Sequence, residues 1–227
     1  MMKSVVVLAL ALASVTPLKA QQRLGGQLAA FADSLVTAAK ARGLPADPVM
    51  EKAIEGSAKG VPAERVIQAL RVVMDQLDTA AVELRVGGIS GDTVAIAAGG
   101  FAITAGLHGQ DVAALAQTGR PAAEVTVGLR VAGTLTALGV PPAETVKLVS
   151  TELRLGRPTA ELLSLPSSVQ GEIARGATPA QAASGLARAA AAQAGGPGGV
   201  HRGPPPGKGP PTHPTPPPHP APPAPHP

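Results

Sequence analysis

Apolar residues recur at steps of three and four along most of this chain, which is the spacing of one face of an α-helix. The longest such segment covers residues 62–85, with charged residues on its opposite face. Its apolar positions are Val66, Leu70, Val73, Leu77, Ala81 and Leu84. The pattern predicts an all-α protein with helices near 24–42, 47–59, 62–85, 92–105, 110–118, 121–138, 141–155 and 178–193.

A short turn pattern separates these segments and occurs six times: a glycine, a proline soon after it, and then Asp, Glu or Gln. The six copies begin at Gly43, Gly60, Gly119, Gly139, Gly156 and Gly176. Glycine tolerates the left-handed conformation that closes a helix. Proline suits the first turn of the next helix, and an acidic residue there faces the positive end of its dipole. The pattern therefore predicts short helices joined by tight turns.

The turn glycines are regularly spaced, at alternating intervals of 20 and 17 residues from Gly119 to Gly176. One pair of intervals makes a unit of 37 residues, within the range of helical-hairpin repeats. Short connections make neighbouring helices antiparallel. We expect the hairpins to stack as in an α-solenoid, with an irregular bundle as the alternative. The tetratricopeptide signature needs aromatic residues that the chain lacks. A possible internal boundary lies at residues 87–91, which are rich in glycine.

The segment between Asp92 and Asp111 contains no charged residue. Gly99 and Gly100 weaken its propensity for helix. Helical spacing nevertheless connects Val94, Ala97, Phe101 and Ala105. We expect a central buried helix here. Two alternatives remain open, a close contact between helices through small residues and an apolar surface for a ligand. A membrane span is not expected, because the segment is short and rich in glycine.

The two ends of the chain differ in composition from residues 21–194, which we assign to one helical domain. Residues 1–20 have a positively charged start, an apolar run from Val5 to Val15, and a small residue, Ala20, at the junction. This pattern is typical of a cleaved export signal, which predicts a periplasmic or secreted protein beginning at Gln21. Residues 195–227 are nearly all Pro, Gly, His, Thr and Ala, a composition that predicts a disordered tail.

Composition excludes several classes of function. The chain has no cysteine, so an exported form has no disulfide. Four of its 19 lysines and arginines lie in the two end segments, which leaves 15 cations against 15 carboxylates in residues 21–193. A neutral domain without Trp or Tyr offers neither the basic surface nor the stacking platforms of a nucleic-acid-binding protein.

No motif for catalysis, a cofactor or a metal is present. His108 is the only histidine of the expected domain, and no acid or nucleophile accompanies it in a recognisable pattern. The glycines around Ser90 do not have the spacing of a nucleophile elbow. The tail contains His201, His213, His219 and His226, but proline resists the bending that a shared metal ion would require. We therefore expect no enzyme activity and no cofactor.

These patterns favour an exported helical-repeat protein that acts as an interaction or scaffold module for an envelope protein or polymer. The alternatives are a carrier with an apolar pocket near Phe101 and an enzyme of unrecognised type. Interface anchors are usually aromatic residues and arginine. The candidate interaction residues are therefore Arg120, Arg154, Arg157, Phe31 and Phe101.

Overall fold

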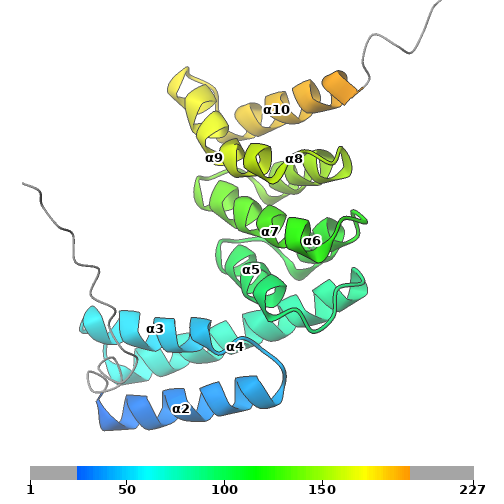
Figure 1. Ribbon diagram of the computed structural model, residues 1–227. Coiled ribbons are helices and arrows are strands. Elements are labelled where there is room, and N and C mark those ends of the chain that lie inside the picture. The colour runs from blue at the N-terminus through cyan, green and yellow to red at the C-terminus, as the bar shows by residue number, and fades with distance from the viewer. Residues whose placement is uncertain (1–24, 195–227) are drawn as a thin grey trace, which may run out of the picture. The chain divides into compact units, whose positions relative to one another are not determined.

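The computed structural model describes residues 25–194, and this part of the chain is entirely helical. The predicted export signal and the predicted disordered tail lie outside the described residues. Figure 1 shows the helices in chain order. They are α2 (Gly26–Ala41), α3 (Asp47–Ala58), α4 (Ala63–Val86), α5 (Thr93–Thr104), α6 (Gly109–Ala116), α7 (Ala122–Ala137), α8 (Pro142–Arg154), α9 (Thr159–Ala174) and α10 (Pro179–Ala194). The prediction of an all-α domain is confirmed.

From α4 onward the helices pack in two rows, each helix touching the one two places later in the chain (Figure 1). One row contains α5, α7 and α9, and the other contains α4, α6, α8 and α10. Before them, α2 and α3 pack on each other and on α4. Contacts that follow chain order in this way define a stack of helical hairpins. The sequence favoured this arrangement over a bundle.

The 37-residue unit predicted from the glycine spacing occurs in the second half of the stack. Helix α7 begins at Ala122 and α9 begins 37 residues later at Thr159. Likewise α8 begins at Pro142 and α10 begins 37 residues later at Pro179. The hairpins α7–α8 and α9–α10 are therefore successive copies of one structural unit.

The predicted turn chemistry is present at the helix ends. All six turn glycines have positive φ, between 65° at Gly60 and 101° at Gly176. After α2, the N–H of Gly43 donates to Lys40 O at 3.1 Å and the N–H of Leu44 donates to Ala39 O at 2.9 Å. This pair of bonds is the Schellman arrangement, which satisfies carbonyl groups that the helix leaves without partners. Glycine is therefore needed at these ends for its backbone conformation.

The sequence placed the turn prolines inside the first turn of the next helix. Four of them instead lie at the residue just before that turn. Each occupies the N-cap position, where its carbonyl group accepts the first bond of the helix, as Pro62 does from the N–H of Val66 at 3.2 Å. Their φ angles lie near −55°, but ψ lies near 140°, which is extended backbone. They are Pro62, Pro121, Pro141 and Pro158. The prediction is correct for Pro179, which is the first residue of α10.

Helix α9 was not predicted. Pro166 lies in its interior, and proline lacks the N–H that would bond one turn earlier, so it weakens a helix there. The buried residues Leu162, Leu165 and Val169 have helical spacing and pack in the common core. Packing against α7 and α10 therefore supports a helix despite the proline.

The predicted helix is present as α5, and it packs through its small residues, which was one of the alternatives that the sequence left open. Val94 and Phe101 are exposed, while Ala97 and Ala105 are half-buried. The buried residues are Ala95, Ile96, Ala98, Gly99, Gly100 and Ala102. A methyl group placed on Gly99 would lie 2.9 Å from the Ala80 Cβ, so the small residues permit close approach to α4. Phe101 and Val94 are too large for that contact, and they lie on the opposite side of α5.

The apolar stripe predicted in residues 62–85 packs into one core that extends from α2 to α10. Leu70 and Leu77 of α4, and Leu129 and Leu135 of α7, are fully buried. The possible boundary at residues 87–91 is a turn between α4 and α5, which pack on each other. Within the described range, no helix combines the length and the apolar character that crossing a bilayer requires.

Candidate functional site

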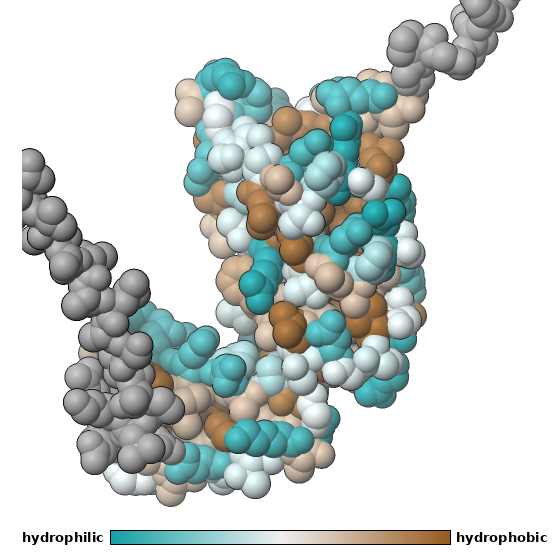
Figure 2. Space-filling view, viewed as in Figure 1, coloured by the Kyte–Doolittle hydropathy of each residue, from teal (hydrophilic) through white to brown (hydrophobic). Residues whose placement is uncertain are grey.

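A groove of about 940 Å³ lies between α3, α4, α5 and α7. Figure 2 shows this part of the surface as an open hollow with hydrophilic residues along its α3 side. The groove exists because α3 packs on α2 and α4 and does not extend the row of α5, α7 and α9. One face of α5 is therefore left without a neighbouring helix.

The floor of the groove is apolar and partly exposed. Val94 and Phe101 of α5 are 54% and 46% exposed, although most large apolar residues of the domain are buried. They are seven residues apart, or about 10 Å along one face of the helix. Ala97 lies between them, and Val73 and Leu77 of α4 extend the apolar lining. The groove thus presents an apolar strip about two helical turns long.

Gly133 of α7 determines where the Phe101 ring lies. A methyl group placed on Gly133 would lie 2.5 Å from Cε1 of Phe101 and 3.2 Å from Cα of Ala102. The ring therefore occupies space that any other residue at position 133 would fill. This packing holds one side of the ring against α7 and leaves the other side open to the groove.

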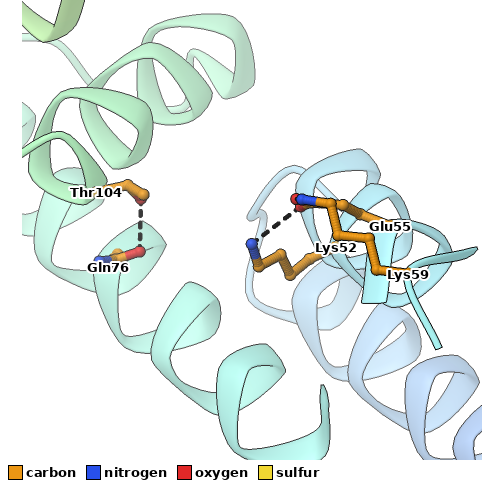
Figure 3. Close-up of polar contacts among 5 residues, drawn as sticks. All are labelled: Lys52, Glu55, Lys59, Gln76 and Thr104. Carbon is orange, nitrogen blue, oxygen red and sulfur yellow. Dashed lines mark hydrogen bonds and ion pairs between the residues drawn. The ribbon is translucent and has the colours of Figure 1, made fainter. Parts of the chain in front are cut away.

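Helix α3 forms an acidic wall. Asp47, Glu51 and Glu55 line the groove at intervals of four residues, so they share one face of the helix. Hydrogen bonds from Lys59 and Lys52 lower the pKa of Glu55 from 4.5 to about 2. The distance between Lys52 Nζ and Glu55 Oε2 is 2.9 Å, and Figure 3 shows the carboxylate between the two lysines. Glu55 is thus paired with two lysines, and these three side chains together carry one net positive charge.

Asp47 and Glu51 differ from Glu55, because neither forms an ion pair within residues 25–194. Glu51 is exposed at the middle of the wall, and Asp47 is exposed in the first turn of α3. These two carboxylates are the negative charge that the acidic wall offers to a binding partner.

The opposite side of the groove carries one cation and several neutral polar groups. Arg130 and Thr134 of α7 line it, and the Arg130 guanidinium is exposed and has no ion-pair partner in the described part of the chain. On the floor, the Thr104 hydroxyl lies 2.7 Å from Gln76 Oε1, which ties α5 to α4 (Figure 3). The groove therefore has an apolar floor between an acidic wall and a weakly basic one.

Of the candidate interaction residues, only Phe101 lies in the groove. Phe31 is half-buried in α2, with the guanidinium carbon of Arg71 5.4 Å from its ring centroid. The three arginines occur near two adjacent turns, since a methyl group on Gly156 would lie 3.4 Å from Arg120 Nη1. Arg154 is exposed there. The role of these residues in binding stays a prediction.

Two of those arginines form ion pairs that link parts of the fold. Arg120 Nε donates to Glu124 Oε2 at 2.9 Å within the start of α7. Arg157 lies 3.5 Å from both Glu152 and Glu161, and its Nη2 donates to Gln193 Oε1 of α10 at 2.7 Å. Arg157 thus connects α8, α9 and α10, which gives it a structural role.

Among the described residues, Glu152 is the one buried carboxylate. Its burial raises its pKa above the usual 4.5, the Arg157 charge opposes this effect, and the Glu161 charge adds to it. The carboxylate faces an arginine and lines no groove, so its burial belongs to the packing of α8 against the following turn.

The chemical groups considered in the sequence do not converge. His108 is exposed before α6, where the Asp111 carboxylate accepts a hydrogen bond from its backbone N–H at 2.8 Å. Ser90 is exposed in the turn before α5. Residues 25–194 contain no group of three or more His, Cys, Asp or Glu side chains placed to hold a metal ion.

The sequence pointed to the floor of this groove and missed its two walls. Phe101 was noted as a candidate contact, and an apolar ligand surface was an alternative for its segment. The acidic wall of α3 lies about 50 residues earlier, and Arg130 lies about 30 residues later. The spacing of Asp47, Glu51 and Glu55 was the available signal, but only the packing of α3 reveals that this face borders α5.

Comparison with models of known protein families, with curated proteins and with solved structures finds no match to this chain.

Proposed function

We propose that this chain is a non-enzymatic interaction module that binds a partner protein in the groove between α3, α5 and α7. The observation that carries the proposal is the apolar strip of Val94 and Phe101, exposed on an otherwise well-packed domain and bordered by charged walls. Exposed apolar surface with a polar rim is typical of protein interaction sites. Stacked hairpins commonly use such concave surfaces for binding.

The proposal places the module in the periplasm or outside the cell, with an envelope protein or polymer as its partner. The support is the composition of residues 1–20, which has the charged start, apolar run and small-residue junction of an export signal. Sequencing the exported protein from its N-terminus should then give Gln21 as the first residue. Recovery of an intact Met1 form from the cytosol alone would contradict the export proposal.

Site-specific photocrosslinking in cells tests the binding proposal. A photoreactive residue at position 94 should give discrete protein adducts, because Val94 is 54% exposed on the groove floor. Position 82 is the matched control, since Val82 of α4 is 52% exposed and does not line the groove. The same set of adducts from both positions, or none from either, would contradict a binding groove at α5.

The second candidate function is a carrier of an apolar small molecule. A volume of about 940 Å³ and an apolar floor favour it, since ligand sites commonly have volumes of about 300–1,000 Å³. The open form and the charged walls favour a protein partner instead, because carriers bury most of the ligand surface. Extraction of purified protein with organic solvent distinguishes the two, since a carrier should release a stoichiometric apolar compound.

A further inference from the structure

The walls of the groove define the chemistry of the partner as well as its place. We propose that the groove binds a basic amphipathic helix, whose apolar face covers Val94 and Phe101 and whose Lys or Arg residues face Asp47 and Glu51. This inference rests on the proposed function and specifies the partner of the same site.

The groove fits a bound segment that is helical. The groove is lined by helices, and residues 25–194 contain no strand whose edge could pair with an extended peptide. The exposed face of α5 has side chains at positions 94, 97 and 101, a spacing of three and four residues. A helix with apolar residues at the same spacing packs its ridges against such a face. A helical partner therefore matches the floor, and it would take the place in the row that α3 does not fill.

Two carboxylates of the acidic wall are available to a bound cation. Asp47 and Glu51 are one turn apart on the same face of α3, about 6 Å along the axis, and no cation of the described residues pairs with them. A Lys or Arg residue on the edge of the bound helix would supply the missing partner. Opposite charges across an interface speed association and disfavour partners of the wrong sign.

The charges on the two walls favour a basic partner over an acidic one. Glu55 already forms ion pairs with Lys52 and Lys59, and on the other wall Arg130 is a single cation without an ion-pair partner in the described range. The lining contains three carboxylates and two cations, Lys52 and Arg130, which gives a net charge of −1. The excess negative charge lies on the α3 side of the apolar strip, at the unpaired Asp47 and Glu51. An acidic helix would meet repulsion along α3 and one favourable contact at α7. A basic helix is consequently the better match, and a single acidic residue on its other edge would suit Arg130.

Binding of synthetic peptides to the full chain, followed by fluorescence anisotropy, tests this inference. The first peptide is an amphipathic helix with leucines at positions 1, 4, 8 and 11 of its apolar face and lysines along its edges. The second has the same leucines, with glutamate in place of every lysine. We expect the basic peptide to bind at least about 10-fold more tightly at low salt, and the difference to shrink as salt screens exposed charges.

Matched variants of the protein locate the binding. Glu51→Lys should reduce the affinity for the basic peptide by about 10-fold and raise the affinity for the acidic peptide. Val94→Gln should weaken both peptides, whereas Val82→Gln, at an equally exposed site outside the groove, should change neither. Circular dichroism of each variant confirms that the helical fold is retained, since all three positions are exposed.

The outcomes separate this inference from the proposed function. Equal binding of the two peptides, or binding unaffected by Glu51→Lys and Val94→Gln, would overturn the basic-helix partner. If position 94 still gave discrete protein adducts, the groove would remain an interaction site for a different partner. Peptide binding seen only after removal of residues 195–227 would overturn the inference and identify the tail as the occupant. Dimerisation lost in Val94→Gln would instead identify a second copy.

Discussion

Gly87, at the end of α4, lies directly against Ala116 of α6. A methyl group placed on Gly87 would lie 2.1 Å from the Ala116 Cβ and 3.1 Å from its Cα and carbonyl carbon. Gly87 has a φ of −80°, so this glycine is required for space. The next residue, Gly88, has a φ of 88° and is required for its backbone conformation. Two adjacent glycines thus serve different needs at the same turn.

Replacing Gly87 with alanine should therefore destabilise the domain. The added methyl group meets backbone atoms of α6, which cannot move aside as a flexible side chain would. We expect the free energy of unfolding to fall by about 1–3 kcal/mol. Gly185 in α10 is the matched control, since a methyl group there has no atom within 4 Å. Gly185→Ala should raise the free energy by about 0.4–1 kcal/mol. Equal effects in urea unfolding would contradict the close approach of α4 and α6.

Leucine truncations test the buried stripes. Leu70 and Leu129 are fully buried in the common core, so Leu70→Ala and Leu129→Ala should each reduce the free energy of unfolding by about 2–5 kcal/mol. Leu163 of α9 is 59% exposed, and Leu163→Ala should change it by no more than about 0.5 kcal/mol. Equal losses of stability at the exposed and buried positions in chemical denaturation would contradict this assignment of the helix faces.

The helices and turns of this fold were largely predictable, because their causes are local. The stripe through Leu70 and Leu77 indicates a helix, and the glycines that follow each stripe indicate its end. Helix α9 was missed because Pro166 gives a local signal against helix, while the packing of Leu162 and Val169 in the core comes from distant residues. The packing of α9 in the core thus outweighs the low helix propensity of its proline.

For the same reason the sequence could not decide which face of α5 is buried, and it could not predict the groove. Spacing places Val94 and Phe101 on one face, and a large apolar face is normally the buried one. In this protein the small face of Gly99 and Gly100 is buried, because α4 approaches so closely that only small residues fit. Which face of α5 is buried depends on how closely α4 approaches it. The sequence of one segment alone does not specify that distance.

The pH dependence of stability should reflect Glu152. Burial raises its pKa, so the folded state binds a proton more tightly than the unfolded state does. The contribution of this proton to stability is therefore complete below the ordinary pKa of 4.5 and is lost as the pH rises through the raised value. We expect Glu152→Gln to raise the melting temperature at pH 7 and to have less effect at about pH 3.5. A loss of stability at pH 7 would mean that the ion pair with Arg157 outweighs the burial of the charge.

Removal of residues 195–227 should leave the folded domain intact. The core that joins α2 to α10 is formed by residues 28–187, and the removed segment is composed mainly of Pro, Gly, His, Thr and Ala. We expect the free energy of unfolding to change by no more than about 0.5 kcal/mol. Thermal unfolding of residues 21–227 and of residues 21–194 makes the comparison, and a large loss of stability would show that the tail packs on the helices.

The most direct test of the central claim is hydrogen exchange of the full chain with and without the basic peptide. Binding in the groove should slow exchange in α3, α5 and the part of α7 around Arg130, because these segments line the site. Exchange in α9 and α10, which do not line it, should stay unchanged. Protection confined to α9 and α10, or absent throughout at saturating peptide, would contradict a binding groove between α3, α5 and α7.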